Sequence, residues 1–231
     1  RDFRELPVLD HRRLRRGDVD SFAADLRSAC VNVGFFILEG LPPRTVELHQ
    51  EVLRVAREFF AQPLEEKSRI DYRNSPQFRG FMWQGAENTA GRRDEREQIE
   101  FGREEPPRTA AEGEGDDAPL PLYDRLRGPN QWPASPPDLR PIVTEWLEDM
   151  EVLSRELTQA LAVSLGLEAQ SLDGMFLSPH VQAKLANYPA RGSPSAVGEK
   201  PVEGLGVGAH SDSGFLTLLL QDEVGGLEVL N

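Results

Sequence analysis

The 231-residue sequence is poor in several features on which proteins commonly rely. Its single cysteine, Cys30, excludes an internal disulfide and a thiolate zinc site, which leaves histidine and carboxylate side chains as metal ligands. Its longest apolar run lies around residues 215–220 and is far shorter than the roughly 18 residues that a membrane span requires. The N-terminal residues 1–4 lack the apolar core of a signal peptide. We therefore expect a soluble, cytoplasmic protein with no membrane partner.

Positive charge is also scarce, since 26 Lys and Arg stand against 39 Asp and Glu. Nucleic-acid binding depends on clustered basic residues, so we expect a small-molecule substrate and no nucleic-acid partner. Residues 94–117 hold ten acids and three bases, and residues 201–231 hold five acids and no base. We interpret the first segment as a solvated loop, with its acidic centre near 103–120. The second segment is apolar, so its carboxylates need partners from elsewhere.

Apolar residues at helical spacing predict three helices before residue 178. The first helix presents Phe22, Leu26, Ala29, Cys30 and Val33 on one face, which makes Cys30 a predicted core residue. The second begins at Pro42–Pro43, and the longest follows Ser135–Pro137 and closes at Gly166. Short strands are expected at 6–10 and, fully buried, at 35–38. We divide this part of the chain into an N-terminal region, 1–135, and a region with the long helix, 136–177.

After about Ser178 the apolar period changes from 3.6 to 2, because Val181, Ala183 and Leu185 alternate with other residues. This alternation predicts a strand with one buried face. Residues 190–206, rich in Gly, Pro and Ser, predict a loop. Three more strands are expected at 207–211, 215–221 and 227–230, with a turn at 222–226. Helices first and antiparallel strands in 178–231 together predict an α+β fold.

The pattern His-x-Asp/Glu, which can place two metal ligands together, occurs twice. His49 and Glu51 lie in a predicted helix, where residues two apart point away from each other, so we expect this pair to be structural or solvated. His210 and Asp212 lie in or beside a predicted strand, where residues two apart share a face. That pair can offer an imidazole nitrogen and a carboxylate oxygen to one metal ion, as in the facial triad of non-haem Fe(II) oxygenases.

The residues around His210 closely resemble a known family. The run 206–222 with 225–229 is similar to the 2-oxoglutarate and Fe(II)-dependent dioxygenases of the isopenicillin N synthase-like superfamily. Further segments resemble the same family in the same order: 6–10, 34–36, 79–81, 128–133 and 165–167. The resemblance therefore covers essentially the whole chain.

The resemblance implies a fold, a reaction and a set of residue roles. It implies that the N-terminal helical region packs on a double-stranded β-helix, or jelly-roll, core. His210 and Asp212 would hold Fe(II), Tyr188 would contact the co-substrate 2-oxoglutarate, and Lys184 would be a polar group of the same site. The enzyme would use O2, release succinate and CO2, and hydroxylate, desaturate or cyclise a small molecule. Ascorbate is a candidate reductant.

One departure from the family bears on activity. The family places a second metal-binding histidine several dozen residues after the His-x-Asp pair, followed by an Arg-x-Ser that holds 2-oxoglutarate, and neither is in this sequence. We therefore expect a truncated jelly roll that is inactive by itself. Two alternatives stay open: a superfamily oxidase that does not use 2-oxoglutarate, and a non-catalytic binding domain. The primary substrate, the reaction outcome and the oligomeric state are left open.

Overall fold

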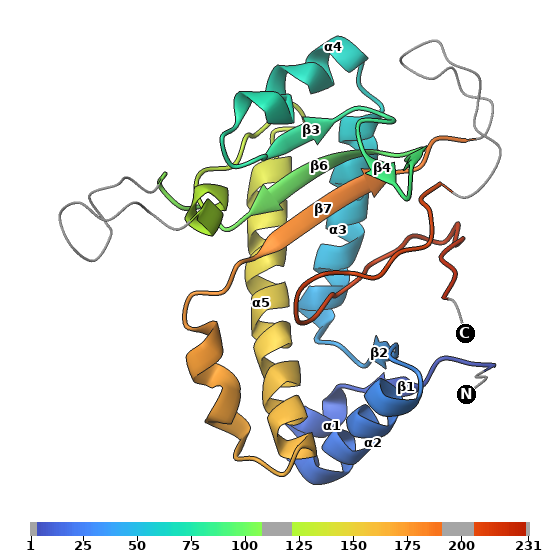
Figure 1. Cartoon of the computed structure of the whole chain (residues 1–231), viewed down its shortest axis with the longest axis vertical. Helices are drawn as coiled ribbons and strands as arrows, with labels where there is room; N and C mark the ends of the chain where they lie inside the picture. Colours follow the sequence, from blue (N-terminus) through green and yellow to red (C-terminus); the bar gives the residue numbers. More distant parts are fainter. Residues whose placement is uncertain (1–3, 108–121, 191–205, 230–231) are drawn as a thin grey trace. The chain divides into compact units, whose positions relative to one another are not determined.

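The computed structural model describes residues 4–107, 122–190 and 206–229 (Figure 1). Within these residues, no helix combines the length and the apolar character that crossing a membrane would require. The chain divides into two compact units, and each draws on all three regions predicted from the sequence. The first unit comprises Arg1–Gln50, Glu148–Pro179 and Gly214–Asn231, and the second comprises Glu51–Leu147 and His180–Ser213.

The first unit contains β1 (Val8–Asp10), α1 (Arg12–Arg15), α2 (Val19–Asn32), β2 (Ile37–Glu39) and η5 (Ala169–Phe176). Strands β1 and β2 pair in parallel. Helix α2 ends as predicted, because Gly34 has a φ of 85° and its N–H donates to the Ala29 carbonyl at 2.9 Å. Strands β1 and β2 confirm the prediction that short strands form near residues 6–10 and 35–38.

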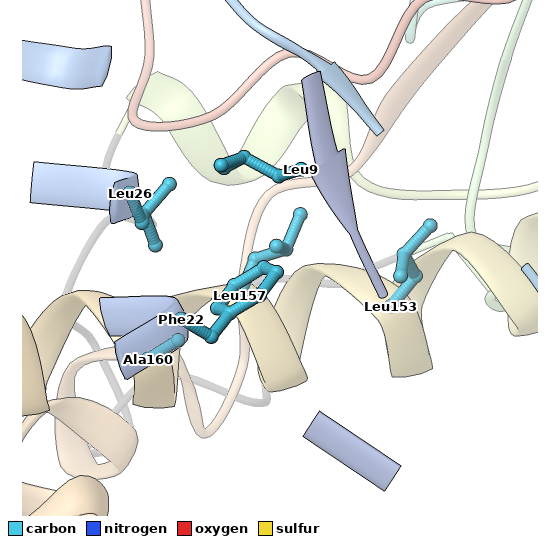
Figure 2. Close-up of a cluster of buried hydrophobic side chains, with 6 residues drawn as sticks. All are labelled: Leu9, Phe22, Leu26, Leu153, Leu157 and Ala160. Atoms are coloured by element: carbon cyan, nitrogen blue, oxygen red, sulfur yellow. The ribbon is translucent and has the colours of Figure 1, made fainter. Parts of the chain in front are cut away.

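A hydrophobic cluster holds the first unit together (Figure 2). Its buried members come from β1, α2 and the later part of the long helix α5 (Leu139–Ser164): Leu9, Phe22, Leu26, Leu153, Leu157 and Ala160. Leu216 and Leu218 pack against the cluster and are partly buried. Burying a large aliphatic or aromatic side chain stabilises a fold by about 1.5–3 kcal/mol, so these side chains contribute to the stability of the unit.

The second unit is built on an antiparallel sheet with the strand order β3-β6-β7 (Figure 1). The strands are β3 (Gly80–Met82), β6 (Glu97–Gly102) and β7 (Gln182–Asn187). In the register of β6 and β7, Glu97 faces Asn187 and Glu100 faces Lys184. The period-2 pattern of the sequence therefore predicts β7 correctly, and Leu185 is its buried residue.

Helices and short turns complete the second unit. They are α3 (Pro43–Phe60), α4 (Leu64–Lys67), η1 (Ser68–Ile70), η2 (Tyr72–Asn74), the hairpin of β4 (Asn88–Thr89) and β5 (Arg92–Arg93), and η4 (Leu122–Leu126). The boundary between the two units falls within α3 and within α5. Phe59 and Phe81 meet edge to face at 6.0 Å and are fully buried, so the ring pair joins α3 to the sheet.

The first part of the acidic segment 94–117, as far as Gly102, is not the solvated loop that its composition predicts. Residues Glu97–Gly102 form the central strand β6, and Asp94, Glu97 and Glu100 are buried. The strand tolerates these carboxylates because bases lie beside them: the Lys67 Nζ is 2.6 Å from Glu97 Oε2, and the Lys184 Nζ is 2.8 Å from Glu100 Oε1. Residues 108–121, which include most of the predicted acidic loop, lie outside the described residues.

Three other predictions need correction. Cys30 is exposed and not in the core, because the buried face of α2 passes through Phe22, Leu26 and Ala29. The strand at 35–38 is not buried: β2 starts only at Ile37, and the side chains of Phe35 and Ile37 are about half exposed. The helix-first, strand-last order is also wrong, since β3 and β6 precede the long helix.

None of the three strands expected between residues 207 and 230 forms within the described part of the chain. Exposure still alternates with period 2 over 215–220, where residues 216, 218 and 220 are the less exposed ones. A strand also needs a neighbour that pairs with its N–H and C=O groups, and no β-pairing partner for these segments lies among the described residues. The turn is present, because Gly225 and Gly226 have positive φ and the Asp222 carboxylate accepts from the Val224 N–H.

Candidate metal and co-substrate site

The structure brings the predicted ligands His210 and Asp212 together. His210 Nε2 lies 3.4 Å from Asp212 Oδ1, and both side chains are about half exposed. Two donors bound at about 2.1 Å and at right angles to each other lie about 3 Å apart on one ion, so this separation suits a shared metal. The two side chains thus lie close together even though the segment does not form the predicted strand.

A hydrogen bond of His210 decides which of its nitrogens is available to a metal. His210 Nδ1 lies 2.8 Å from the carbonyl oxygen of Gly208, and a carbonyl can only accept. Nδ1 must therefore carry the proton, and in the neutral imidazole the lone pair is on Nε2, the atom that faces Asp212. The donor set of one imidazole nitrogen and one carboxylate oxygen fits Fe(II).

Just before His210, the segment that carries the pair contacts other parts of the second unit. The Glu95 N–H donates to the Gly206 carbonyl at 2.7 Å. Beside it, Gly208 lies against β4, where an added Cβ would be 3.3 Å from Thr89 Cγ2. These contacts place the segment next to the end of β6 without a strand ladder.

Tyr188 and Lys184 lie on β7 and its continuation, on one face of the strand. Tyr188 directly follows the last strand residue, and its side chain is 52% exposed. Lys184 Nζ lies 2.8 Å from Glu100 Oε1 and 3.4 Å from Glu87 Oε1. The ammonium of Lys184 therefore has protein partners of its own, and its role toward a co-substrate stays a prediction.

Two residues near Tyr188 were missed from the sequence, Arg96 and Glu87. Arg96 hydrogen-bonds to Tyr188, and its Nη2 lies 2.6 Å from Glu87 Oε2. Burial lowers the pKa of Arg96, but the hydrogen bonds to Tyr188 and Glu87 outweigh it and raise the pKa above its ordinary value. For Glu87, burial raises the pKa, and Lys184 and Arg96 together bring it below the usual range. Arg96 was overlooked because the acidic segment 94–117 was interpreted as a loop, whereas Glu87 lies before that segment and belongs to no motif in the sequence.

The remaining histidines have other surroundings. His11 is buried with Nε2 at 2.6 Å from Glu156 Oε2, and it lines a small cavity of about 170 Å³. Burial lowers the pKa of His49, against the opposing effect of Asp149. Burial, then Arg79 and Arg127, lower the pKa of His180. The described residues contain no group of three or more His, Cys, Asp or Glu side chains that could hold one ion.

Comparison with protein families identifies the chain. Residues 6–135 match the family described as non-haem dioxygenase in morphine synthesis N-terminal. Residues 180–231, which contain Tyr188, His210 and Asp212, match the 2OG-Fe(II) oxygenase superfamily. The two matches follow each other along the chain in the order that the resemblance implied.

Curated proteins agree with these families. A 2-oxoglutarate-dependent dioxygenase of Dothideomycetidae sp. is 33% identical over 99% of this chain and 59% of its own length. A homoarginine-6-hydroxylase of Glycine max is 32% identical over 100% of this chain and 70% of its own length. The chain thus spans a little over half to about two thirds of the length of the relatives that it matches.

Solved structures share the fold. A putative 2OG-Fe(II) oxygenase family protein of Caulobacter crescentus superimposes with a TM-score of 0.64 at 21% identity, over 84% of this chain and 59% of the other. A Neurospora crassa protein solved in complex with alpha-KG gives a TM-score of 0.61 at 23% identity, over 80% and 54%. Oxygenases of this kind have a jelly-roll core. The similarity of this chain to them, together with its mixture of helices and sheet, confirms the predicted fold class. The chain belongs to the 2OG-Fe(II) oxygenase superfamily.

Proposed function

We propose that the protein carrying this chain is a 2-oxoglutarate-dependent oxygenase in which His210 and Asp212 hold Fe(II) and Tyr188 contacts 2-oxoglutarate. The observation that carries the proposal is the convergence of His210 Nε2 and Asp212 Oδ1 at 3.4 Å, with the imidazole proton held on the opposite nitrogen. Family membership supports the same assignment. Half-exposed side chains leave both donors accessible to an ion from solvent.

Each residue has a defined task in this proposal. His210 offers a lone pair and Asp212 a negative charge, and together they hold the metal ion on one side. The Tyr188 hydroxyl donates a hydrogen bond to a carboxylate oxygen of 2-oxoglutarate and so orients the co-substrate. Bound Fe(II) would supply the redox chemistry that couples oxidative decarboxylation of 2-oxoglutarate to oxidation of the substrate. One oxygen atom of O2 enters succinate and the other enters the hydroxylated product, with release of CO2.

We propose hydroxylation of a small molecule as the outcome. One relative is named as a hydroxylase, and the acidic composition disfavours anionic polymers as substrates. The third metal ligand and a basic anchor for 2-oxoglutarate remain predictions, since no complete ligand group lies among the described residues.

The proposal is tested in the full-length protein with His210→Ala and Asp212→Ala. Each variant should keep its circular dichroism spectrum but lose Fe(II)-dependent succinate formation from 2-oxoglutarate, because one of three protein ligands is missing. Binding of Mn(II), followed by its electron paramagnetic resonance signal, should weaken in parallel. His180→Ala is the matched control and should retain turnover, since it removes an imidazole that contacts neither ligand. Undiminished succinate formation in both ligand variants would refute the assignment.

A further inference from the structure

Packing alone leaves the Tyr188 side chain only partly fixed. One edge of its ring lies against the backbone of Gly206, where an added Cβ would be 2.7 Å from Tyr188 Cδ1. Half of the side chain is nevertheless exposed, and the residue has passed the last hydrogen-bonded pair of β7. A hydroxyl in this position can rotate and can either donate or accept, so a specific contact with a carboxylate requires a further partner.

Arg96 is placed to be that partner. The antiparallel register pairs Glu97 with Asn187, and continuing it by one residue sets Arg96 directly opposite Tyr188. The two side chains share a hydrogen bond. A guanidinium has five N–H donors and no acceptor, so the phenol oxygen must be the acceptor in this bond. The hydroxyl proton of Tyr188 is therefore left to donate elsewhere.

The guanidinium is itself held in place by carboxylates. Arg96 Nη2 lies 2.6 Å from Glu87 Oε2 and 3.3 Å from Asp94 Oδ2, and only 16% of the Arg96 side chain is exposed. Glu87 also lies 3.4 Å from the Lys184 ammonium through its other oxygen. A guanidinium that is mostly shielded from solvent and paired with two carboxylates has little freedom to leave the phenol, so the protein fixes the direction of the bond to Tyr188.

We propose that Arg96 is a positioning residue that occupies the acceptor side of the Tyr188 hydroxyl and so commits its proton to the carboxylate of 2-oxoglutarate. The inference rests on the proposed function, and it adds Arg96, the residue that directly precedes strand β6. A donor that is already accepting a charge-assisted hydrogen bond becomes a stronger donor itself, because hydrogen bonds in a chain polarise one another. Arg96 would thus act on co-substrate affinity through Tyr188 and without touching the co-substrate.

A double-mutant cycle tests this in the full-length protein. The dissociation constant of 2-oxoglutarate is measured by calorimetry with Mn(II) in place of Fe(II) and without O2. Tyr188→Phe should weaken binding about tenfold and Arg96→Met about fivefold, as expected for a hydrogen bond to a charged group and for its support. Adding Arg96→Met to Tyr188→Phe should cost nothing further. Arg96→Lys, which also only donates, should recover most of the affinity, and Arg92→Met on the exposed strand β5 is the matched control.

A second readout needs no co-substrate. The protein is labelled with 3-fluorotyrosine, and the fluorine signal of residue 188 is assigned by its loss in Tyr188→Phe. Arg96→Met should shift or broaden that signal, whereas Arg92→Met should leave it unchanged. The inference would be overturned if Arg96→Met weakened binding equally in the presence and absence of the Tyr188 hydroxyl. It would also be overturned if Arg96→Met left the fluorine signal unchanged. A wild-type protein that binds no 2-oxoglutarate would instead refute the proposed function, and the fluorine experiment would still judge the Arg96 contact.

Discussion

At the scale of single residues, the hydrogen bond from His210 to Gly208 determines how this chain can meet a metal ion. It holds the proton on Nδ1 and turns the lone pair of Nε2 toward Asp212. The bond comes from the backbone only two residues earlier, so it does not depend on a strand ladder. This explains how a segment without regular structure still presents two aligned ligands.

Removing the Tyr188 hydroxyl measures its share in co-substrate binding. Tyr188→Phe should raise the apparent KM for 2-oxoglutarate by the equivalent of about 1–3 kcal/mol, the usual value of a hydrogen bond to a charged group. The affinity for Fe(II) should change little, because the metal ligands are elsewhere. Steady-state succinate assays give the KM, and Tyr123→Phe, at an exposed tyrosine in η4, serves as the control. An unchanged KM would return Tyr188 to a packing role.

At the scale of elements, the helices were the easiest to predict and the strands the hardest. Helix α5 shows its period over many turns and ends at Ser164, just before the predicted stop at Gly166. Strand β6 was missed because its glutamates suggested a loop, and only the pairing with Lys67 and Lys184 makes their burial tolerable. The expected strands at 207–230 fail for the opposite reason: the alternation is present, but a ladder requires a partner strand.

The candidate site likewise contains residues that the local sequence reveals and residues that only strand pairing brings into place. His210, Asp212 and Tyr188 could be selected from the sequence, because a short motif and a family resemblance point to them. Arg96 and Glu87 could not, because Arg96 comes to lie opposite Tyr188 only through the pairing of β6 with β7, and Glu87 reaches the site through its ion pair with Arg96. Cross-strand neighbours are set by register, which local sequence patterns leave open.

The backbone at the start of β3 has a conformation and a close neighbour that only glycine accommodates. Gly80 has a φ of 117°, and an added Cβ would be 2.2 Å from the Ile70 carbonyl oxygen. Gly80→Ala should therefore lower the free energy of unfolding by about 2–4 kcal/mol, measured by urea denaturation. Gly174→Ala in η5 is the control, since nothing lies within 4 Å of its Cβ position and its φ is ordinary. Equal stability of the two variants would contradict the assigned backbone conformation.

At the scale of the whole molecule, acid should destabilise the protein in two steps. Burial lowers the pKa of His49, so the unfolded chain takes up a proton there first, and the stability that His49 contributes above about pH 6.5 is lost as the pH falls. The pKa of Glu87 is lowered by Lys184 and Arg96 despite burial, so its contribution is present above about pH 4.3 and is lost below that.

Urea denaturation at a series of pH values separates the two steps. His49→Asn should reduce the slope of the stability profile between about pH 7 and pH 5 and leave the acid end unchanged, because an imidazole titrates in that range and a carboxylate titrates below it. Glu87→Gln should flatten the acid end. A profile whose upper part keeps its slope in His49→Asn would mean that another group, with His180 the next to test, controls that range.

The ion pairs buried in the central sheet limit which sequences can keep this fold. Lys67 lies against Glu97, and Lys184 against Glu100, in pairs that contain side chains almost closed to solvent. Replacing Lys67 alone leaves the Glu97 carboxylate buried without its ammonium partner, at a cost of about 3–5 kcal/mol, whereas replacing both members of a buried pair by apolar residues of similar size is often neutral. During evolution, a substitution at one member of a pair should therefore be accompanied by a substitution at the other. Across related sequences, residues 67 and 97 should covary, and so should residues 184 and 100.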